Sequence, residues 1–459
     1  MDDKKWAWER LNEEDINEFA MEYIQFLSHV KTERESVEYM KTLAEAHDFK
    51  PIDSCEKLSP GDKVYSIFKN KMILLAVIGE KNPVDGLRFI GAHIDAPRLD
   101  LKPSPLYEDS GIALLKTHYY GGIKKYQWVN IPLAIHGVVV LKDGTKKHIV
   151  IGEDPKDPTF VIPDLLPHLA RKKQGERKGF DIVKGEELRI LVGNKPAKVE
   201  EDKKVKDKVK KMILDILNEK YGISEEDFIS ADLEIVPAIK PREAGFDRSM
   251  IAAYGQDDRI CAYTTLRAIL DVTKPKETCI AVFVDREEIG SDGNAGAKSR
   301  FLEVFIGDLI EKFNGSATER DVLKAFINSR AISADVDAAV NPIYKDVHDT
   351  QNAGYLGKGV IVTKYTGAGG KYGASEAHAE FMAWIRRIFD KRAVPWQPGL
   401  LGKVDEGGGG TIAKYFAERG IDVVDIGPGL IGMHSPYEIS SKADLYSAYL
   451  AYKTFFEEE

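Results

Sequence analysis

Histidine and carboxylate residues repeatedly follow apolar segments of this chain. His93 and Asp95 follow the segment RFIGA, and two adjacent glutamates, Glu287 and Glu288, follow CIAVFVDR. Asp335 follows the segment RAISA. Imidazole nitrogens and carboxylate oxygens are ligands of divalent metals, and a carboxylate that binds no metal can act as a general base. These residue types at these places therefore predict a metal centre that activates water.

Two more segments supply the same kinds of side chain. His434 follows VVDIGPGLIGM, and the pair Asp257 and Asp258 directly precedes the helical segment RICAYTTLRAILDVT. In open α/β sheets, sites form outside the carboxyl ends of the strands, so these distant residues are expected at one sheet edge. Carboxylates crowded there would raise one another's pKa, and divalent cations remove that repulsion.

The number of donors fits two metal ions. We expect His93 and Asp335 to bind one ion, Glu288 and His434 to bind the other, and Asp257 to bridge them. Imidazole and carboxylate ligands suit zinc, with cobalt or manganese as substitutes. The cofactor prediction is therefore two divalent ions per chain, zinc by preference.

Two carboxylates remain outside this ligand set. Glu287 would lie beside the shared water, where a general base is needed. Asp95 comes two residues after His93 and is expected to accept the outer ring N–H of that histidine. Each signal alone has an ordinary structural explanation, such as an exposed turn for the glutamates or a helix cap for Asp257. The joint pattern favours the metal centre.

The pattern of apolar and polar residues, which predicts the helices and strands that position these side chains, changes along the chain. Residues 1–50 have helical periodicity, 71–79 and 87–95 read as buried strands, and strands alternate with helices after residue 236. Between them, alternating residues and the turn KDGT indicate antiparallel strands, followed by a Lys-rich helix in 200–222. We expect an α/β fold with a doubly wound, mostly parallel sheet. The catalytic domain would comprise residues 1–102 and 236–459, and residues 103–235 would form an inserted β-rich domain.

Bulk composition limits the classes of partner. The chain has 459 residues, a net charge of −9, and 43% hydrophobic residues. The negative net charge argues against nucleic-acid binding, because a nucleic-acid-binding protein should carry a basic face, and no segment reads as a signal peptide or a membrane span. The three cysteines are scattered, which is typical of a reducing compartment. We expect a cytoplasmic protein that binds neither nucleic acid nor membrane.

The motif order HxD, DD, EE, D and H resembles that of the dinuclear-zinc exopeptidases, in particular the aspartyl aminopeptidase family. The segments GAHIDAPRLDLKP, DREEIGS, SADVDAAVNP, YGASEAHAEF and GMHSPYEI also resemble that family, in its order and across essentially the whole chain. The resemblance implies removal of N-terminal residues from peptides by the ligands and base named above. It also implies a β-barrel-like dimerisation or lid domain, and dimers that assemble into a dodecamer.

The resemblance implies three further site residues. His168, in VIPDLLPHLAR, corresponds to a histidine that reaches the active site of a neighbouring subunit. Lys364 and Lys371 are the candidates for binding the acidic side chain of the substrate's N-terminal residue. Three alternatives stay open: an aminopeptidase of neutral or broad preference, a catalytically silent assembly or cargo protein, and a metal-dependent deacylase of non-peptide amides.

Overall fold

A computed structural model describes residues 5–198 and 205–458 of the chain. The start of the Lys-rich stretch, residues 200–204, lies outside the described residues. The chain divides into two compact units, which are described separately. The first unit comprises residues 1–95, 241–433 and 437–459, and the second comprises residues 96–240 and 434–436.

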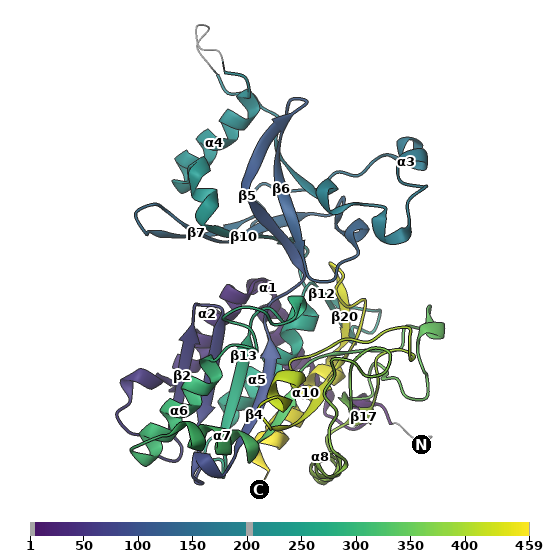
Figure 1. Ribbon diagram of the computed structural model, residues 1–459. Coiled ribbons are helices and arrows are strands. Elements are labelled where there is room, and N and C mark those ends of the chain that lie inside the picture. The colour runs from purple at the N-terminus through teal and green to yellow at the C-terminus, as the bar shows by residue number, and fades with distance from the viewer. Residues whose placement is uncertain (1–4, 199–204, 459) are drawn as a thin grey trace. The chain divides into compact units, whose positions relative to one another are not determined.

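A nine-stranded sheet forms the centre of the first unit (Figure 1). Its strands, in spatial order, are β1 (Lys50–Pro51), β2 (Lys63–Phe68), β3 (Met72–Val77), β13 (Thr278–Val284), β4 (Leu87–His93), β14 (Arg330–Ser333), β18 (Asp422–Gly427), β16 (Val360–Thr363) and β17 (Trp396–Pro398). The central strands β13, β4, β14 and β18 are parallel to one another. Strand β3 is antiparallel to β2 and to β13, and β16 is antiparallel to β18. The expected α/β class is confirmed, with antiparallel strands on both sides of the parallel centre.

Helices cover both faces of this sheet. Successive side chains of a strand point to opposite faces, so an entirely apolar strand needs a covering layer on each side. In β3, Ile73 and Leu75 join one buried cluster, and Leu74 and Ala76 join the other. The first cluster includes residues of α1 (Glu13–His29), α2 (Glu33–Ala46), α5 (Gln256–Asp271), α8 (Ala379–Lys391) and α10 (Lys442–Glu457). The second includes residues of α6 (Phe301–Asn314) and α7 (Glu319–Ile327), together with residues in and beside α9 (Ala413–Ala417). The apolar run MILLAV is therefore buried on both sides.

A smaller five-stranded sheet completes the first unit. Its strands, in spatial order, are β11 (Arg242–Ala244), β12 (Met250–Ala253), β20 (Glu438–Ser441), β19 (Gly429–Ile431) and β15 (Asp337–Ala338). Strand β12 leads directly into α5, and Ala253 pairs with Glu438 of β20. This pairing brings the C-terminal part of the chain to the start of α5.

The second unit contains a six-stranded sheet of antiparallel pairs. Its strands, in spatial order, are β8 (Lys146–Ile151), β7 (Leu133–Val140), β10 (Ala231–Pro237), β5 (Arg98–Asp109), β6 (Ile112–Tyr120) and β9 (Arg189–Gly193). The turn KDGT joins β7 to β8, as the sequence predicts. Helix α4 (Lys208–Tyr221) packs beside β5, β6 and β9 (Figure 1). Within the described residues the order of the assigned strands ends at β8 and β9, so these strands alone do not close the expected barrel-like sheet. Single bridges join Phe160 to Leu133 of β7 and Val161 to Leu191 of β9.

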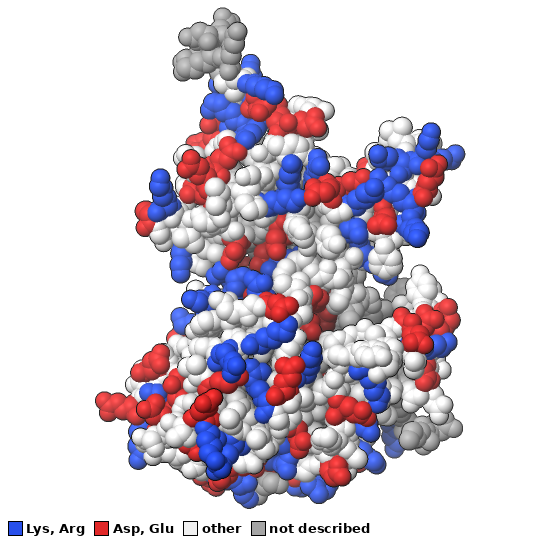
Figure 2. All heavy atoms as spheres, in the orientation of Figure 1, with Lys and Arg blue, Asp and Glu red and all other residues white. Residues whose placement is uncertain are grey.

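Charged side chains are mixed on the surface of each unit. Figure 2 shows Asp and Glu interspersed with Lys and Arg over the visible face of the first unit. In the second unit, the last turn of α3 (Pro167–Lys173) carries three basic residues. Among the residues that the structure describes, no helix has both the length and the apolar character needed to span a membrane.

Candidate metal centre

Three neighbouring parallel strands bring most of the expected site residues to one edge of the large sheet. Strand β4 lies between β13 and β14, and all three run in the same direction. His93 is the last residue of β4, the two glutamates follow β13, and Asp335 follows β14. The carboxyl ends of parallel strands share one edge, which explains why residues far apart in sequence meet here.

The imidazole of His93 has carboxylates near both ring nitrogens. Its Nε2 lies 3.7 Å from Asp335 Oδ1 and 4.0 Å from Asp257 Oδ1. Its Nδ1 lies 3.6 Å from Asp95 Oδ1 and 3.7 Å from Asp258 Oδ1. The ring is buried, with 3% of its surface exposed. One nitrogen therefore points towards the expected ligands, and the other points away from them.

Asp95 fixes the turn that carries the two glutamates. Its Oδ1 accepts the backbone N–H of Glu287 at 3.0 Å, and its Oδ2 accepts that of Glu288 at 3.2 Å. The Asp95 carboxylate, which was expected to accept from His93 Nδ1, lies 3.6 Å from that nitrogen. The backbone oxygen of Asp95 is closer, at 3.3 Å. Asp95 thus connects the end of β4 to the Glu287–Glu288 turn, a link that sequence spacing did not reveal.

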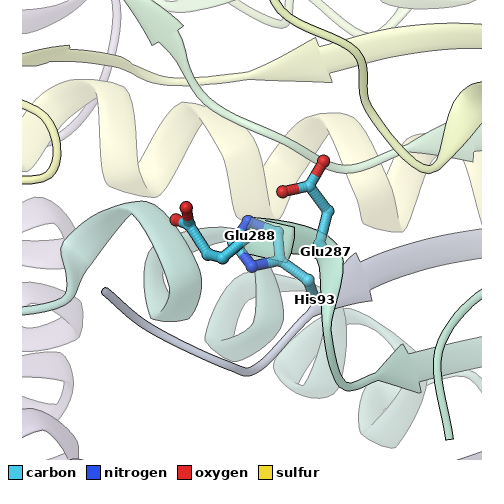
Figure 3. A group of neighbouring side chains, drawn as sticks. All are labelled: His93, Glu287 and Glu288. Carbon is cyan, nitrogen blue, oxygen red and sulfur yellow. The ribbon is translucent and has the colours of Figure 1, made fainter. Parts of the chain in front are cut away.

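The adjacent glutamates form a single 3-10 turn, Glu287–Ile289, directly after β13. Arg286 before the turn and Gly290 after it both have positive φ, 69° and 88°. The turn closes through the Gly290 N–H, which donates to the Glu287 carbonyl at 2.8 Å. Figure 3 shows the two carboxylates pointing in different directions near His93, and one ligand atom from each of the three residues lies within 4.8 Å of the others.

The start of α5 positions Asp257 without a capping side chain of its own. The N-cap residue is Gly255, in the left-handed conformation at φ 69°. The buried carboxylate of Glu438 takes the place of a cap, because its Oε2 accepts the backbone N–H of Gln256 at 2.5 Å and of Asp257 at 3.1 Å. An anion is favourable at a helix N-terminus. Glu438, in the motif SPYEI, is therefore a structural support of the site that residue types alone did not predict.

Ionisation of all the carboxyl groups at this edge at once is unfavourable. Burial, as the largest cause, raises the pKa of Glu287 to about 8 and that of Asp258 to about 7. Burial also raises the pKa of Glu288 and of Asp335, and the nearby charge of Asp257 raises both further. This is the electrostatic situation that divalent cations relieve.

His93 shows the opposite balance. Burial lowers the pKa of its imidazolium, but the neighbouring carboxylates of Asp335 and Asp95 outweigh burial and raise the pKa well above its usual value. A charged imidazolium thus offsets part of the negative charge around it. Binding of a metal ion at Nε2 requires the neutral ring, so metal binding and loss of a proton are coupled at this residue.

The remaining expected site residues are described within the unit that contains each of them. His434 has φ 63° and belongs to the second unit, where its Nδ1 lies 3.0 Å from the Gly122 carbonyl oxygen. His168 is exposed on α3 of the second unit. Lys364 and Lys371 are exposed in the first unit, and their Nζ atoms lie 3.8 and 3.0 Å from carboxylate oxygens of Glu376.

Comparison with known proteins identifies the family. A family model described as "Aminopeptidase I zinc metalloprotease (M18)" matches residues 26–456. The chain belongs to this family. A probable M18 family aminopeptidase 1 of Thermotoga maritima is 51% identical over 457 residues, covering 99% of each chain. Another, of Borrelia garinii subsp. bavariensis, is 50% identical over 461 residues, covering 99% of this chain and 100% of the relative.

Solved structures agree with this assignment. The crystal structure of an M18 aminopeptidase from Thermotoga maritima matches with a TM-score of 0.96 at 50% identity and covers 100% of both chains. A more distant match, at 21% identity and a TM-score of 0.77, covers 97% of each chain and is titled a dodecamer of mApe1 from S. cerevisiae. The M18 chain described here is thus a zinc-dependent aminopeptidase.

Proposed function

We propose that this aminopeptidase uses two metal ions and Glu287 as general base to remove acidic residues from the N-terminus of peptides. The observation that carries the proposal is the orientation of His93, with Nε2 towards Asp257 and Asp335 and with Glu287 and Glu288 beside it. A cluster of buried carboxylates around one imidazole is a donor set that fits zinc.

In this proposal each donor has one role. His93 and Asp335 bind one ion, Asp257 binds both, and Glu288 binds the second ion with His434. The role of His434 as a ligand of the second ion is proposed from the order of motifs in the sequence. When bound, the ions lower the pKa of a shared water and polarise the scissile carbonyl. Cobalt and manganese would satisfy the same ligands.

Glu287 moves the proton in this reaction. Its carboxylate takes a proton from the attacking water and then gives it to the departing amine of the peptide. Asp95 supports this step, because it accepts the backbone N–H groups of Glu287 and Glu288 and so holds both side chains at the end of β13. The exposed His168 would contribute from a neighbouring subunit, where it donates a hydrogen bond to the oxyanion of the tetrahedral intermediate.

We further propose that residues 103–235 form an inserted dimerisation or lid domain between the two parts of the catalytic domain, 1–102 and 236–459. Dimers would then assemble into a dodecamer, which is the assembly named for the yeast mApe1 structure. Sedimentation velocity of the purified protein tests this assembly, and a monomer or isolated dimer at working concentration would contradict it.

The substrate preference has two candidates. Lys364 and Lys371 would bind an acidic side chain, but both lie near Glu376, whose charge offsets part of theirs. That pairing favours the second candidate, an aminopeptidase of neutral or broad preference. Rates across aminoacyl p-nitroanilides, with zinc content measured in the same preparation, separate the two. Faster cleavage of aspartyl and glutamyl substrates supports the acidic preference, whereas faster cleavage of leucyl or lysyl substrates excludes it.

The variant Glu376→Gln sharpens this test, because it leaves both lysines without the competing carboxylate. If the lysines bind the acidic side chain of the substrate, the ratio of kcat/KM for the aspartyl substrate to kcat/KM for the leucyl substrate rises several-fold in the variant. An unchanged ratio would place Lys364 and Lys371 outside the substrate-binding site.

A further inference from the structure

We propose that Asp258, the second of the two adjacent aspartates at the start of α5, is a positioning residue for His93. Its carboxylate would accept the hydrogen of His93 Nδ1 when a metal ion is bound on the Nε2 side. The inference rests on the proposed function, because it requires His93 to be a metal ligand.

The burial and surroundings of Asp258 carry the inference. The residue is 1% exposed, and its Oδ1 lies 3.7 Å from His93 Nδ1. Among the described residues, neither carboxylate oxygen of Asp258 has a hydrogen-bond partner. A buried carboxylate without hydrogen bonds destabilises a fold. Folding therefore does not explain why Asp258 is present, whereas its position beside His93 Nδ1 points to a role in orienting that ring.

Asp95, the other carboxylate near Nδ1, is already engaged. Each of its two oxygens accepts a backbone N–H, one from Glu287 and one from Glu288. A shift of Asp95 towards His93 would therefore pull on the turn that carries the glutamates. Asp258 can approach Nδ1 without breaking a hydrogen bond of its own. The Nδ1–H would exchange its long contact with the Asp95 carbonyl oxygen, at 3.3 Å, for a charged acceptor. Asp258 is therefore better placed to follow the ring as a metal binds.

Arg259 holds the far side of the Asp258 carboxylate. Its Nη1 lies 3.6 Å from Asp258 Oδ2 and donates to the Gly255 carbonyl oxygen at 3.2 Å. The guanidinium is fully buried, with 0% of its side chain exposed. Oδ2 thus faces a fixed positive charge and Oδ1 faces the imidazole, which orients the carboxylate along the line from Arg259 to His93.

A ligand histidine that donates its other N–H to a carboxylate has a fixed ring orientation and a more basic metal-binding nitrogen. Removal of such a carboxylate typically lowers metal affinity 10–100-fold. A residue that only supports the fold would instead change stability and leave metal affinity alone. These two outcomes separate a positioning role from a structural one.

The variant Asp258→Asn tests the role by zinc competition titration against a chromogenic chelator. We expect the affinity for the more tightly bound zinc to fall about 10–100-fold, and the absorption bands of the cobalt-loaded protein to shift. The melting temperature of the metal-free variant does not test the role, because the variant also leaves the fully buried Arg259 guanidinium without the neighbouring carboxylate charge. The zinc affinity decides.

Asp444→Asn is the matched control. Asp444 is also fully buried, but its oxygens accept the backbone N–H groups of Gly357 at 2.6 Å and Gly359 at 2.7 Å. We expect this variant to melt at a lower temperature and to bind zinc with the affinity of the wild type.

Wild-type zinc affinity in Asp258→Asn would overturn the inference. If that variant does not fold, a crystal structure of the zinc-loaded wild type decides the question. An Asp258 oxygen within about 3.2 Å of His93 Nδ1 supports the role, and a longer distance refutes it. A wild-type protein that binds no zinc, or fails to cleave peptides, would instead contradict the proposed function.

Discussion

Replacement of Glu287 by glutamine separates general-base catalysis from metal binding. The variant keeps the length of the side chain, and it keeps the backbone N–H that donates to Asp95 at 3.0 Å. The 3-10 turn should therefore persist, with Glu288 in place. Loss of a general base lowers turnover by about 10²–10⁴-fold, which is about 3–5 kcal/mol in the activation barrier. We expect kcat to fall by that factor while the zinc content stays at the wild-type value.

The same variant should change the stability of the metal-free protein with pH. The pKa of Glu287 rises from 4.5 to about 8 in the folded chain, with burial as the largest cause. The folded protein therefore binds this proton more tightly than the unfolded chain, and the wild type loses stability as pH rises through that window. Glutamine removes the loss, so metal-free Glu287→Gln should gain on the order of 1–3 kcal/mol relative to the wild type between pH 5 and 8.

The assays are stopped-flow or steady-state hydrolysis, metal analysis, and urea unfolding of the metal-free protein at several pH values. Glu303→Gln on α6 is the control, because Glu303 is partly exposed and pairs with Arg419 at 3.0 Å away from the sheet edge. It should leave turnover unchanged. Near-normal turnover of zinc-loaded Glu287→Gln would refute the role of Glu287 as general base.

Three further outcomes follow from the same geometry. Asp95→Asn puts an amide N–H against one of the backbone N–H groups of Glu287 and Glu288, and the displaced turn should lower kcat by up to about 10²-fold with little change in KM. Gly255→Ala should lower the melting temperature, because φ is 69° and a Cβ would lie 1.8 Å from Arg259 Nη1. Zinc binding near pH 7 should release protons, because the pKa of Glu287 is raised to about 8 in the metal-free chain, and calorimetry in buffers of different ionisation enthalpy would measure that release.

The sequence predicted the edge of the sheet where the site lies. His93, the two glutamates and Asp335 each follow an apolar strand, and the structure gives those strands as the neighbours β13, β4 and β14. Residue type and strand ends were enough here because the ends of adjacent parallel strands must share an edge. The ion count and the ligand roles of these residues stay predictions.

The contacts between backbone and side chains were not predictable in the same way. The Glu438 carboxylate accepts two N–H groups at the start of α5, and 181 positions separate it from Asp257. Nothing in the local sequence marks such a cap, since Gly255 carries no side chain. Likewise, the hairpin of β2 and β3 turns at Lys69 and Asn70, both with positive φ, and this turn places an antiparallel pair beside the parallel centre.

The two pairs of adjacent acids have a common geometric explanation. Successive side chains point about 100° apart around an α-helix and about 120° apart around a 3-10 helix. Asp257 and Asp258 open α5, so one faces His93 Nε2 and the next faces Nδ1. Glu287 and Glu288 open a 3-10 turn, and their carboxylates diverge in Figure 3. Two neighbouring acids at a helix start thus cannot share one ligand position. In each proposed pair, one acid binds metal and the other acts beside it.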